Sequence, residues 1–269
     1  MLIDAFPFAT ELDILEIRLN SLNKYVDYFI LVESEKTQTL RDKPLYFELN
    51  KERYKSFLDK IIHIKILADE CKVFNPNSWE MEHFQRNCIT RGIKQINPTD
   101  RDYLMISDAD EIPDLSLIPD TRENLTPVCS FDMTYHTFYA NLLTQNKRWI
   151  GTVLTPIVVL NKMNPQAIRD AKDSIKNKII GGWHLGYMGG KEAVYKKFLN
   201  CIEPMDKSLI PPFEVFCEEF DRKIKNGGSF LFSDKIDDSI KLNECAIEYP
   251  LLPEYLTNNK EKFKHLFWI

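Results

Sequence analysis

The chain has 269 residues, of which 44% are hydrophobic and 28% are charged, and its formal net charge is -5. These proportions are those of an ordinary globular protein and exclude a disordered or fibrous one. No run of lysines and arginines stands out, so a nucleic-acid partner is not expected. The longest apolar runs have the length of strands, and the N-terminal segment lacks the features of a signal peptide. We therefore expect no transmembrane segment and a cytoplasmic protein.

The six cysteines are widely scattered along the chain and form no Cys-x-x-Cys motif. This spacing is typical of free thiols in a reducing compartment rather than of a disulfide framework. Metal binding by sulfur is not expected.

Strand-like and helix-like segments alternate in the first half of the chain. The first apolar run is followed by Leu12, Leu15, Leu19 and Leu22 at helical spacing, after a capping signal at Thr10. Strands separated by helical crossovers indicate an α/β fold with a mostly parallel, Rossmann-like sheet flanked by helices. Strands are predicted over residues 2–6, 26–32, 61–67 and 103–106, and helices over residues 12–22, 50–59 and 78–96.

The second half of the chain is less regular. Two further strand-like segments are candidates for an antiparallel extension of the sheet, and a third segment suits a strand or a loop. Asn226-Gly227-Gly228 is a strong helix stop. The predicted segments are strands over residues 130–139 and 152–160, a strand or loop over 178–187, and helices over 191–201, 213–225 and 255–269.

The most informative segment begins with the predicted strand over residues 103–106 and continues as Ser107-Asp108-Ala109-Asp110-Glu111-Ile112-Pro113. Side chains alternate along an extended chain, so Asp108 and Asp110 lie on the same side. They also follow the carboxyl end of a strand, where ligands bind in such sheets. Two carboxylates in this position suit Mg²⁺ or Mn²⁺. The alternative is that these acids cap a turn in solvent, because Asp-x-Asp is frequent by chance.

Together with other segments, this motif resembles glycosyltransferase family 17, the family of the bisecting N-acetylglucosaminyltransferases. The resemblance is carried in order along nearly the whole chain. The matching segments are residues 4–19, 26–29, 32–34 and 43–45, Gln85-Arg86-Asn87, residues 107–113 and 149–152, Gly182-Trp183-His184, and residues 227–255.

The resemblance implies a single GT-A domain over residues 1–269, with a nucleotide-binding half over 1–113 and an acceptor-binding half with C-terminal helices over 114–269. It implies inverting transfer of a sugar, with N-acetylglucosamine the first expectation, from a UDP-sugar to a glycan hydroxyl. The implied cofactor is Mn²⁺ or Mg²⁺. Animal members carry a membrane anchor and stem, whereas this chain begins at its first predicted strand, so a bacterial or viral relative is expected.

The same resemblance assigns residues to the donor and the cation. Asp108, Asp110 and His184 are the expected metal ligands, and Asp108 is also expected at the donor. A lone histidine is otherwise more often a buried core residue. Glu33 is assigned by position instead: it ends the second predicted strand at the same edge as Asp108 and Asp110, and it is expected to accept from uracil or ribose, or to be a solvated acid. Arg86 suits a donor-site role or a plain ion pair with Glu82, four residues earlier.

Three further residues are assigned by position. Phe6 and Pro7, at the end of the first predicted strand, are expected to contact the donor. An inverting transfer needs a carboxylate base that is not bound to the metal. Glu192 is the predicted base, because the bisecting enzymes resemble this chain in carrying a glutamate there and a helix N-terminus favours its charged form. Its alternative role is an ordinary glutamate of a first helical turn. Asp132 and Glu111 are the reserve candidates for the base.

Two other functions are alternatives to a glycosyltransferase. A nucleotidyltransferase also joins an α/β sheet to paired acids, but no glycine-rich basic signature lies near the first strand, where Phe6-Pro7-Phe8 stands. A non-catalytic nucleotide-sugar or glycan binder is disfavoured by the intact acids and histidine. Trp149, Trp183 and Tyr187 are candidates for stacking on sugar rings, although most aromatic residues belong to the core.

Overall fold

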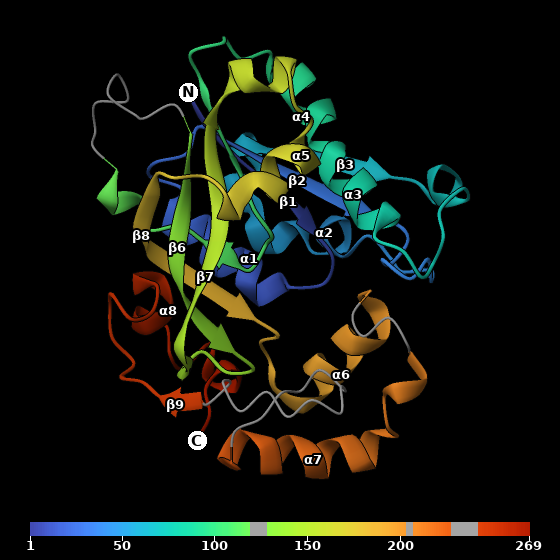
Figure 1. Cartoon of the computed structure of the whole chain (residues 1–269), viewed down its shortest axis with the longest axis vertical. Helices are drawn as coiled ribbons and strands as arrows, with labels where there is room; N and C mark the ends of the chain where they lie inside the picture. Colours follow the sequence, from blue (N-terminus) through green and yellow to red (C-terminus); the bar gives the residue numbers. More distant parts are fainter. Residues whose placement is uncertain (119–127, 203–206, 227–241) are drawn as a thin grey trace.

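The computed structural model describes residues 1–118, 128–202, 207–226 and 242–269, and it contains one nine-stranded sheet in this part of the chain (Figure 1). The strand order is β3-β2-β1-β4-β7-β6-β8-β5, with β9 paired to β7. The strands are β1 Leu2–Phe8, β2 Tyr28–Ser34, β3 Ile61–Ile66, β4 Tyr103–Ile106, β5 Glu111–Ile112, β6 Cys129–Thr137, β7 Leu142–Pro156, β8 Lys178–Gly186 and β9 Leu242–Glu244.

Helices connect these strands and cover the sheet. The α-helices are α1 Leu12–Leu22, α2 Tyr46–Leu49, α3 Glu80–Asn87, α4 Ile89–Ile96, α5 Pro165–Asp170, α6 Gly190–Asn200, α7 Phe213–Asn226 and α8 Glu254–Asn258. The 3₁₀ helices are η1 Lys51–Lys60, η2 Ala68–Cys71, η3 Leu115–Leu117, η5 Ile157–Asn161, η6 Ala171–Asp173, η7 Lys207–Leu209 and η8 Lys264–Leu266.

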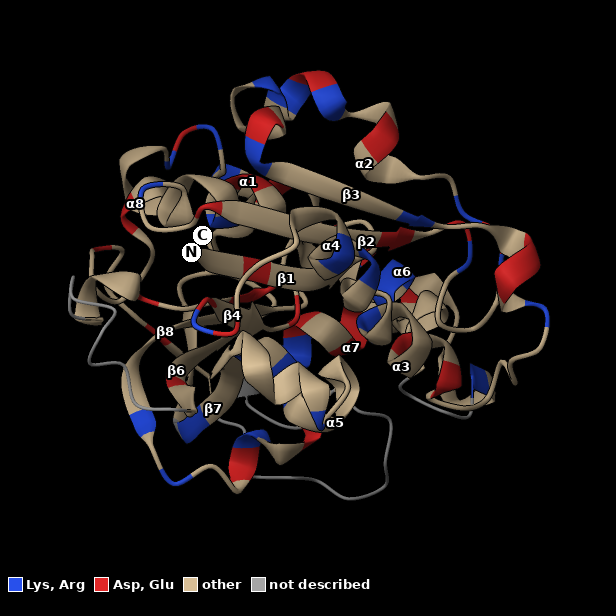
Figure 2. Cartoon of the chain, turned by 90° about the horizontal axis from the view of Figure 1, so that it is seen from above, with Lys and Arg blue, Asp and Glu red and all other residues tan. Residues whose placement is uncertain are grey.

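The strands β3, β2, β1 and β4 are mutually parallel and form one half of the sheet (Figure 2). Each is joined to the next by helical crossovers, which is why the strands run in the same direction. Their residues are almost entirely apolar because helices cover both faces. The predicted α/β class is confirmed. The carboxyl ends of these strands meet at one edge, and Asp108 and Asp110 follow the last of them.

The other half of the sheet is mostly antiparallel. β4 pairs antiparallel with β7, and β7 pairs antiparallel with β6, while β8 runs parallel to β6 and antiparallel to β5. The predicted antiparallel extension is therefore confirmed. The predicted strand over residues 152–160 is wrong in its limits, because β7 begins at Leu142 and the chain turns into η5 after Pro156. The first half of β7 was not predicted because residues 144–148 are all polar and lack the apolar pattern of a strand.

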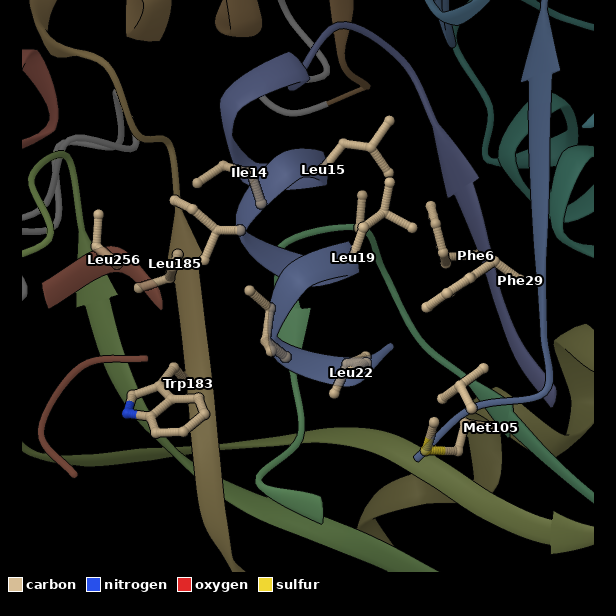
Figure 3. Packing of buried hydrophobic residues seen from close by; sticks show 14 of the residues in the cluster. Phe6, Ile14, Leu15, Leu19, Leu22, Phe29, Met105, Trp183, Leu185 and Leu256 are labelled. Atoms are coloured by element: carbon tan, nitrogen blue, oxygen red, sulfur yellow. The ribbon is translucent and has the colours of Figure 1, made fainter. Parts of the chain in front are cut away.

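One face of the sheet packs against α1 and α8 (Figure 3). Leu15 and Leu19 of α1 contact Phe6 of β1 and Phe29 of β2 within the larger hydrophobic cluster, and all four are buried. The opposite face packs against α3, α4 and α5. There, Gly92 of α4 approaches β2 so closely that an added Cβ would lie 2.6 Å from a side-chain atom of Ile30.

Two predicted helices were wrong in extent. The segment over residues 78–96 is divided into α3 and α4 at Cys88, and α3 begins after Trp79 rather than Ser78. The predicted helix over 255–269 is only the short α8 followed by turns, since Asn258 and Asn259 end the helix. Residues 50–59 lie mainly in the 3₁₀ helix η1. The predicted stop at Gly227-Gly228 lies outside the described residues.

Helices α6 and α7 lie together below the sheet in Figure 1, away from α3, α4 and α5. Their contact is apolar: Val194 and Phe198 of α6 share a buried cluster with Phe216 and Phe220 of α7. Figure 2 shows acidic and basic residues interspersed over the helices and loops seen from above, in agreement with the mixed charge of the sequence. No helix within the described residues is long and apolar enough to cross a membrane.

Candidate active site

The turn that carries Asp108 and Asp110 is fixed from beneath by a buried arginine. The guanidinium of Arg18 in α1 donates to the carbonyl oxygens of Asp108, Ala109 and Glu111 at 3.2, 3.3 and 2.6 Å. The same side chain forms a two-bonded ion pair with Asp4 of β1, at 2.8 and 2.6 Å, and both side chains are fully buried. A carbonyl-lined turn needs donors of this kind when it is removed from water.

Asp108 is held between two arginines. Its Oδ1 accepts from Arg86 of α3 at 2.7 Å, and its Oδ2 accepts from Arg169 of α5 at 3.0 Å. Desolvation alone would raise the pKa of Asp108, but the two guanidinium groups outweigh it and hold the pKa far below its usual range. Arg86 also pairs with Glu82 at 2.9 Å, so it makes the expected ion pair on its helix and contacts the acid motif as well.

Glu111 is fully buried beside this pair. Its carboxylate accepts from Trp149 Nε1 at 2.5 Å, from the Asp108 N–H at 3.1 Å and from Arg169. Burial raises the pKa of Glu111 to about 7, against the opposing effect of Arg169. Gly151 of β7 leaves the space for this side chain, because an added Cβ would lie 3.2 Å from the Glu111 Cδ. Glu111 therefore connects the acid motif to Trp149 and Arg169 from a buried position.

Asp110 and His184 are brought together by the pairing of β5 with β8, in which His184 lies opposite Glu111. His184 Nε2 lies 3.7 Å from Asp110 Oδ1, and its ring stacks on Trp149 with centroids 4.2 Å apart. Burial lowers the pKa of His184 to about 4, so the ring is neutral at pH 7. Its Nδ1 has no hydrogen-bond partner within the described structure.

The second oxygen of Asp110 faces a lysine. Lys197 of α6 places its Nζ 3.1 Å from Asp110 Oδ2 and 3.6 Å from Glu11 Oε1. Although burial alone would lower the pKa of Lys197, Asp110 and Glu11 raise it well above its usual value. The lysine also lies over the ring of Tyr187 at 4.9 Å. The contact between Lys197 and Asp110 thus joins α6 to the acid motif.

The other residues assigned to the donor lie in the core or near it. Glu33 is fully buried and accepts from the Phe47 N–H at 3.0 Å, and its second oxygen lies 3.1 Å from His63 Nε2. Phe6 is also fully buried, against α1, whereas Pro7 is half-buried. The structure therefore does not bring Glu33 or Phe6 to an exposed surface.

The candidates for the base lie apart from one another. Glu192 is exposed on the first turn of α6, about 140° around the helix from Lys197 at 3.6 residues per turn, so it does not face Asp110. Asp132 of β6 accepts from Arg148 Nε at 2.7 Å, and its side chain is 22% exposed. Glu111 is enclosed. Within the described residues, neither Glu192 nor Asp132 forms a hydrogen bond or ion pair with the acid motif.

The aromatic candidates have different positions. Trp149 stacks on His184, whereas Trp183 is buried in the core and donates to the Pro250 carbonyl at 2.8 Å. Gly182, next to it, has φ +101°, and an added Cβ would lie 2.6 Å from the Ile112 carbonyl oxygen. A glycine is required here because β8 passes directly against the backbone of β5.

Several residues of the site were not found from the sequence. Asp4 and Arg18 could have been recognised, because each is a charged residue within the apolar pattern of a buried strand or helix. Arg169 and Lys197 could not have been recognised, because they lie on short or amphipathic helices and reach the site only through the tertiary fold.

Within the described ranges, no group of three histidine, cysteine, aspartate or glutamate side chains is arranged around one cation position. Two of the expected ligands, Asp110 and His184, lie 3.7 Å apart, measured from Oδ1 to Nε2. Two ligands of one Mg²⁺ or Mn²⁺ ion, each about 2.0–2.2 Å from it, lie roughly 3–4 Å apart, so this pair fits two positions of a shared ion.

The fold and this site define an α/β protein with an acid motif at the carboxyl edge of its parallel strands. Residues 1–188 match the profile of glycosyltransferase family 17, and the chain belongs to this family. It is a glycosyltransferase, with a sugar donor and a glycan acceptor. The family match confirms the resemblance seen in the sequence.

Comparison with solved structures gives a more distant likeness. The inositol-1-phosphate CTP transferase from T. maritima is 10% identical, with a TM-score of 0.36, over 77% of this chain and 96% of that chain. A comparison with curated proteins found no match.

Proposed function

We propose that the protein transfers a sugar from a UDP-sugar to a glycan hydroxyl with inversion, using a divalent cation held by Asp110 and His184. N-acetylglucosamine is the proposed sugar. The observation that supports this most strongly is the approach of a neutral histidine to the second acid of the motif, at 3.7 Å, in a chain of family 17. A neutral imidazole beside a carboxylate is a suitable donor pair for Mn²⁺ or Mg²⁺.

The two acids of the motif then have different tasks. Asp108 keeps both oxygens on Arg86 and Arg169, yet each oxygen has a second lone pair and the side chain is 37% exposed. We assign it to the donor, as an acceptor for a ribose hydroxyl or for water on the cation. Asp110 binds the cation directly. When bound, the cation offsets the negative charge that gathers on the departing diphosphate.

Other side chains of the protein orient the turn of Asp108 and Asp110 and the ring of His184. Arg18 fixes the turn from below, and Glu111 ties the turn to Trp149 and Arg169. Trp149 in turn holds the ring of His184 by stacking. The acceptor hydroxyl must lose its proton to a carboxylate that does not bind the cation. Glu192 is the proposed base because its side chain is exposed and does not face Asp110.

A panel of nucleotide sugars tests the proposal. UDP release is measured for UDP-, GDP- and CMP-sugars with Mn²⁺ and with excess EDTA, together with the thermal unfolding of each mixture. A ligand at about 100 times its Kd stabilises the protein by about 2.7 kcal/mol, which is readily measured. We expect stabilisation and turnover with a UDP-sugar and Mn²⁺ only. Full turnover in EDTA would refute the role of the cation, and turnover confined to a GDP- or CMP-sugar would refute the donor.

A further inference from the structure

Lys197 occupies a position at Asp110 that a cation favours. Its Nζ lies 3.1 Å from Asp110 Oδ2 and 3.6 Å from Glu11 Oε1, so one ammonium bridges two carboxylates. His184 lies on the other side of the same Asp110 carboxylate, 3.7 Å from Oδ1. Asp110 therefore faces an ammonium through one oxygen and a metal-ligating side chain through the other.

The packing of α6 determines where this ammonium lies. Val194 and Phe198 on one side of the helix are buried against α7, and this contact fixes the rotation of the helix. Lys197 is then directed to Asp110, with its side chain 29% exposed, whereas the adjacent Lys196 is exposed to solvent. The two neighbouring lysines differ in position and not in charge.

An ammonium and a divalent ion at the same carboxylate repel each other strongly, because the site is partly removed from water. Asp110, Glu11 and Lys197 together carry one negative charge. A divalent ion changes the sign of that total, and a diphosphate makes it negative again. The long, flexible side chain of a lysine can follow this change, since its ammonium rotates on a four-carbon stem.

We propose, resting on the proposed function, that Lys197 neutralises Asp110 when no divalent ion is bound and pairs with the donor's diphosphate when the ion takes Asp110. The lysine thus weakens binding of the ion alone and strengthens binding of the donor. Ion and donor then bind cooperatively, and each raises the affinity of the other by the same factor. Lys197 is a donor-binding residue that also protects the empty site from the free ion.

Binding of Mn²⁺ alone to the full chain tests this directly. Free Mn²⁺ is measured by electron paramagnetic resonance for the wild type, Lys197→Met, Lys197→Arg and Lys196→Met. Loss of the competing charge at Lys197 is expected to tighten Mn²⁺ binding by at least roughly tenfold. Lys197→Arg keeps the charge, and Lys196→Met removes an exposed charge from the same helix, so both are expected within about twofold of the wild type.

The second measurement is UDP affinity at saturating Mn²⁺. Lys197→Met is expected to weaken UDP binding by about tenfold or more, the value of one charge-assisted hydrogen bond to phosphate. Thermal unfolding checks the fold of each variant, and Lys197→Gln replaces Lys197→Met if the latter does not fold. Mn²⁺ affinity of the neutral Lys197 variants equal to or below that of the wild type, or unchanged UDP affinity, overturns the inference.

The role of Lys197 and the proposed function can fail independently, and the measurements distinguish the two failures. If UDP release requires Mn²⁺ but the Lys197 variants bind Mn²⁺ as the wild type does, the inference is wrong and the function stands. If Lys197→Met tightens Mn²⁺ binding and weakens UDP binding while no UDP-sugar is turned over, the function is wrong and the inference stands.

Discussion

Replacement of Arg18 by methionine is expected to damage the protein in two ways. The substitution leaves the carboxylate of Asp4 buried without its partner, because both side chains are fully buried and joined by two bonds of 2.6 and 2.8 Å. Breaking a buried pair from one side costs about 3–5 kcal/mol. At about 2–4 °C per kcal/mol for a large domain, the melting temperature falls by about 6–20 °C.

A double variant separates stability from function. Asp4→Leu combined with Arg18→Met removes both charges and leaves side chains of similar volume, so the part of the lost stability that comes from the unpaired Asp4 should return. The carbonyls of Asp108, Ala109 and Glu111 still lack their donor, and the turn is free to shift. A displacement of about 1 Å at a reacting centre can cost about 10²-fold in turnover. We therefore expect a folded protein with low activity.

The control for this experiment is another arginine that contacts α1. Arg53 pairs with Glu16 at 2.7 Å and with Asp13, and its side chain is 28% exposed. Arg53→Met should cost clearly less than Arg18→Met, because Arg53 is partly exposed and Glu16 keeps its contacts with Tyr255 and Lys262. Unfolding is followed by circular dichroism and turnover by UDP release. If Arg18→Met melts within a degree of the wild type and keeps its turnover, the role given to Arg18 is refuted.

Three further predictions concern the site, and a fourth concerns His136, a buried histidine of β6. Asp110→Asn should lower metal-dependent turnover by about 10²-fold or more with an intact fold, checked by UDP release and circular dichroism. His184→Phe should keep the ring stack on Trp149 and the melting temperature but weaken Mn²⁺-dependent UDP binding, and normal binding would make His184 a core residue. Glu192→Gln should lower turnover by about 10²–10⁴ at unchanged donor affinity, and full turnover would move the base to Asp132 or Glu111. Burial lowers the pKa of His136 to about 4, below its value of about 6.5 in the unfolded chain, so unfolding takes up a proton between these values. Stability should therefore fall as the pH drops from about 6.5 to 4, with a smaller slope in His136→Asn; an unchanged slope would contradict this.

The parallel half of the sheet could be predicted because its signals are local. Apolar runs at strand length, separated by helical spacing, gave β1 to β4 and α1. The limits of β7 could not be predicted, because polar residues at 144–148 belong to a long strand whose pairing with β6 and β9 is a tertiary property. The same holds for the end of the chain, where packing against α1 replaces the regular helix that its spacing predicted.

The candidate site also contains residues that local sequence could predict and residues that it could not. Asp108 and Asp110 come just after β4, so their place at this edge was predictable, and His184 came from the family resemblance. The expected extended chain was wrong, because residues 109–110 form a turn, and the two carboxylates contact different partners. Glu33 also ends a strand at this edge, but its burial and its contacts with a backbone N–H and a histidine could not be predicted from position alone. Arg169 and Lys197 reach the acids from elements far along the chain, so no local pattern predicts their contacts.

The most direct test of the central proposal is the anomalous diffraction of Mn²⁺ in crystals of the protein grown with UDP. We predict one strong peak about 2.0–2.3 Å from an Asp110 carboxylate oxygen and from His184 Nε2, in contact with the diphosphate. The peak should be absent in crystals of Asp110→Asn. A peak that contacts neither Asp110 nor His184, or UDP bound in the same place without any Mn²⁺ peak, would contradict the proposal.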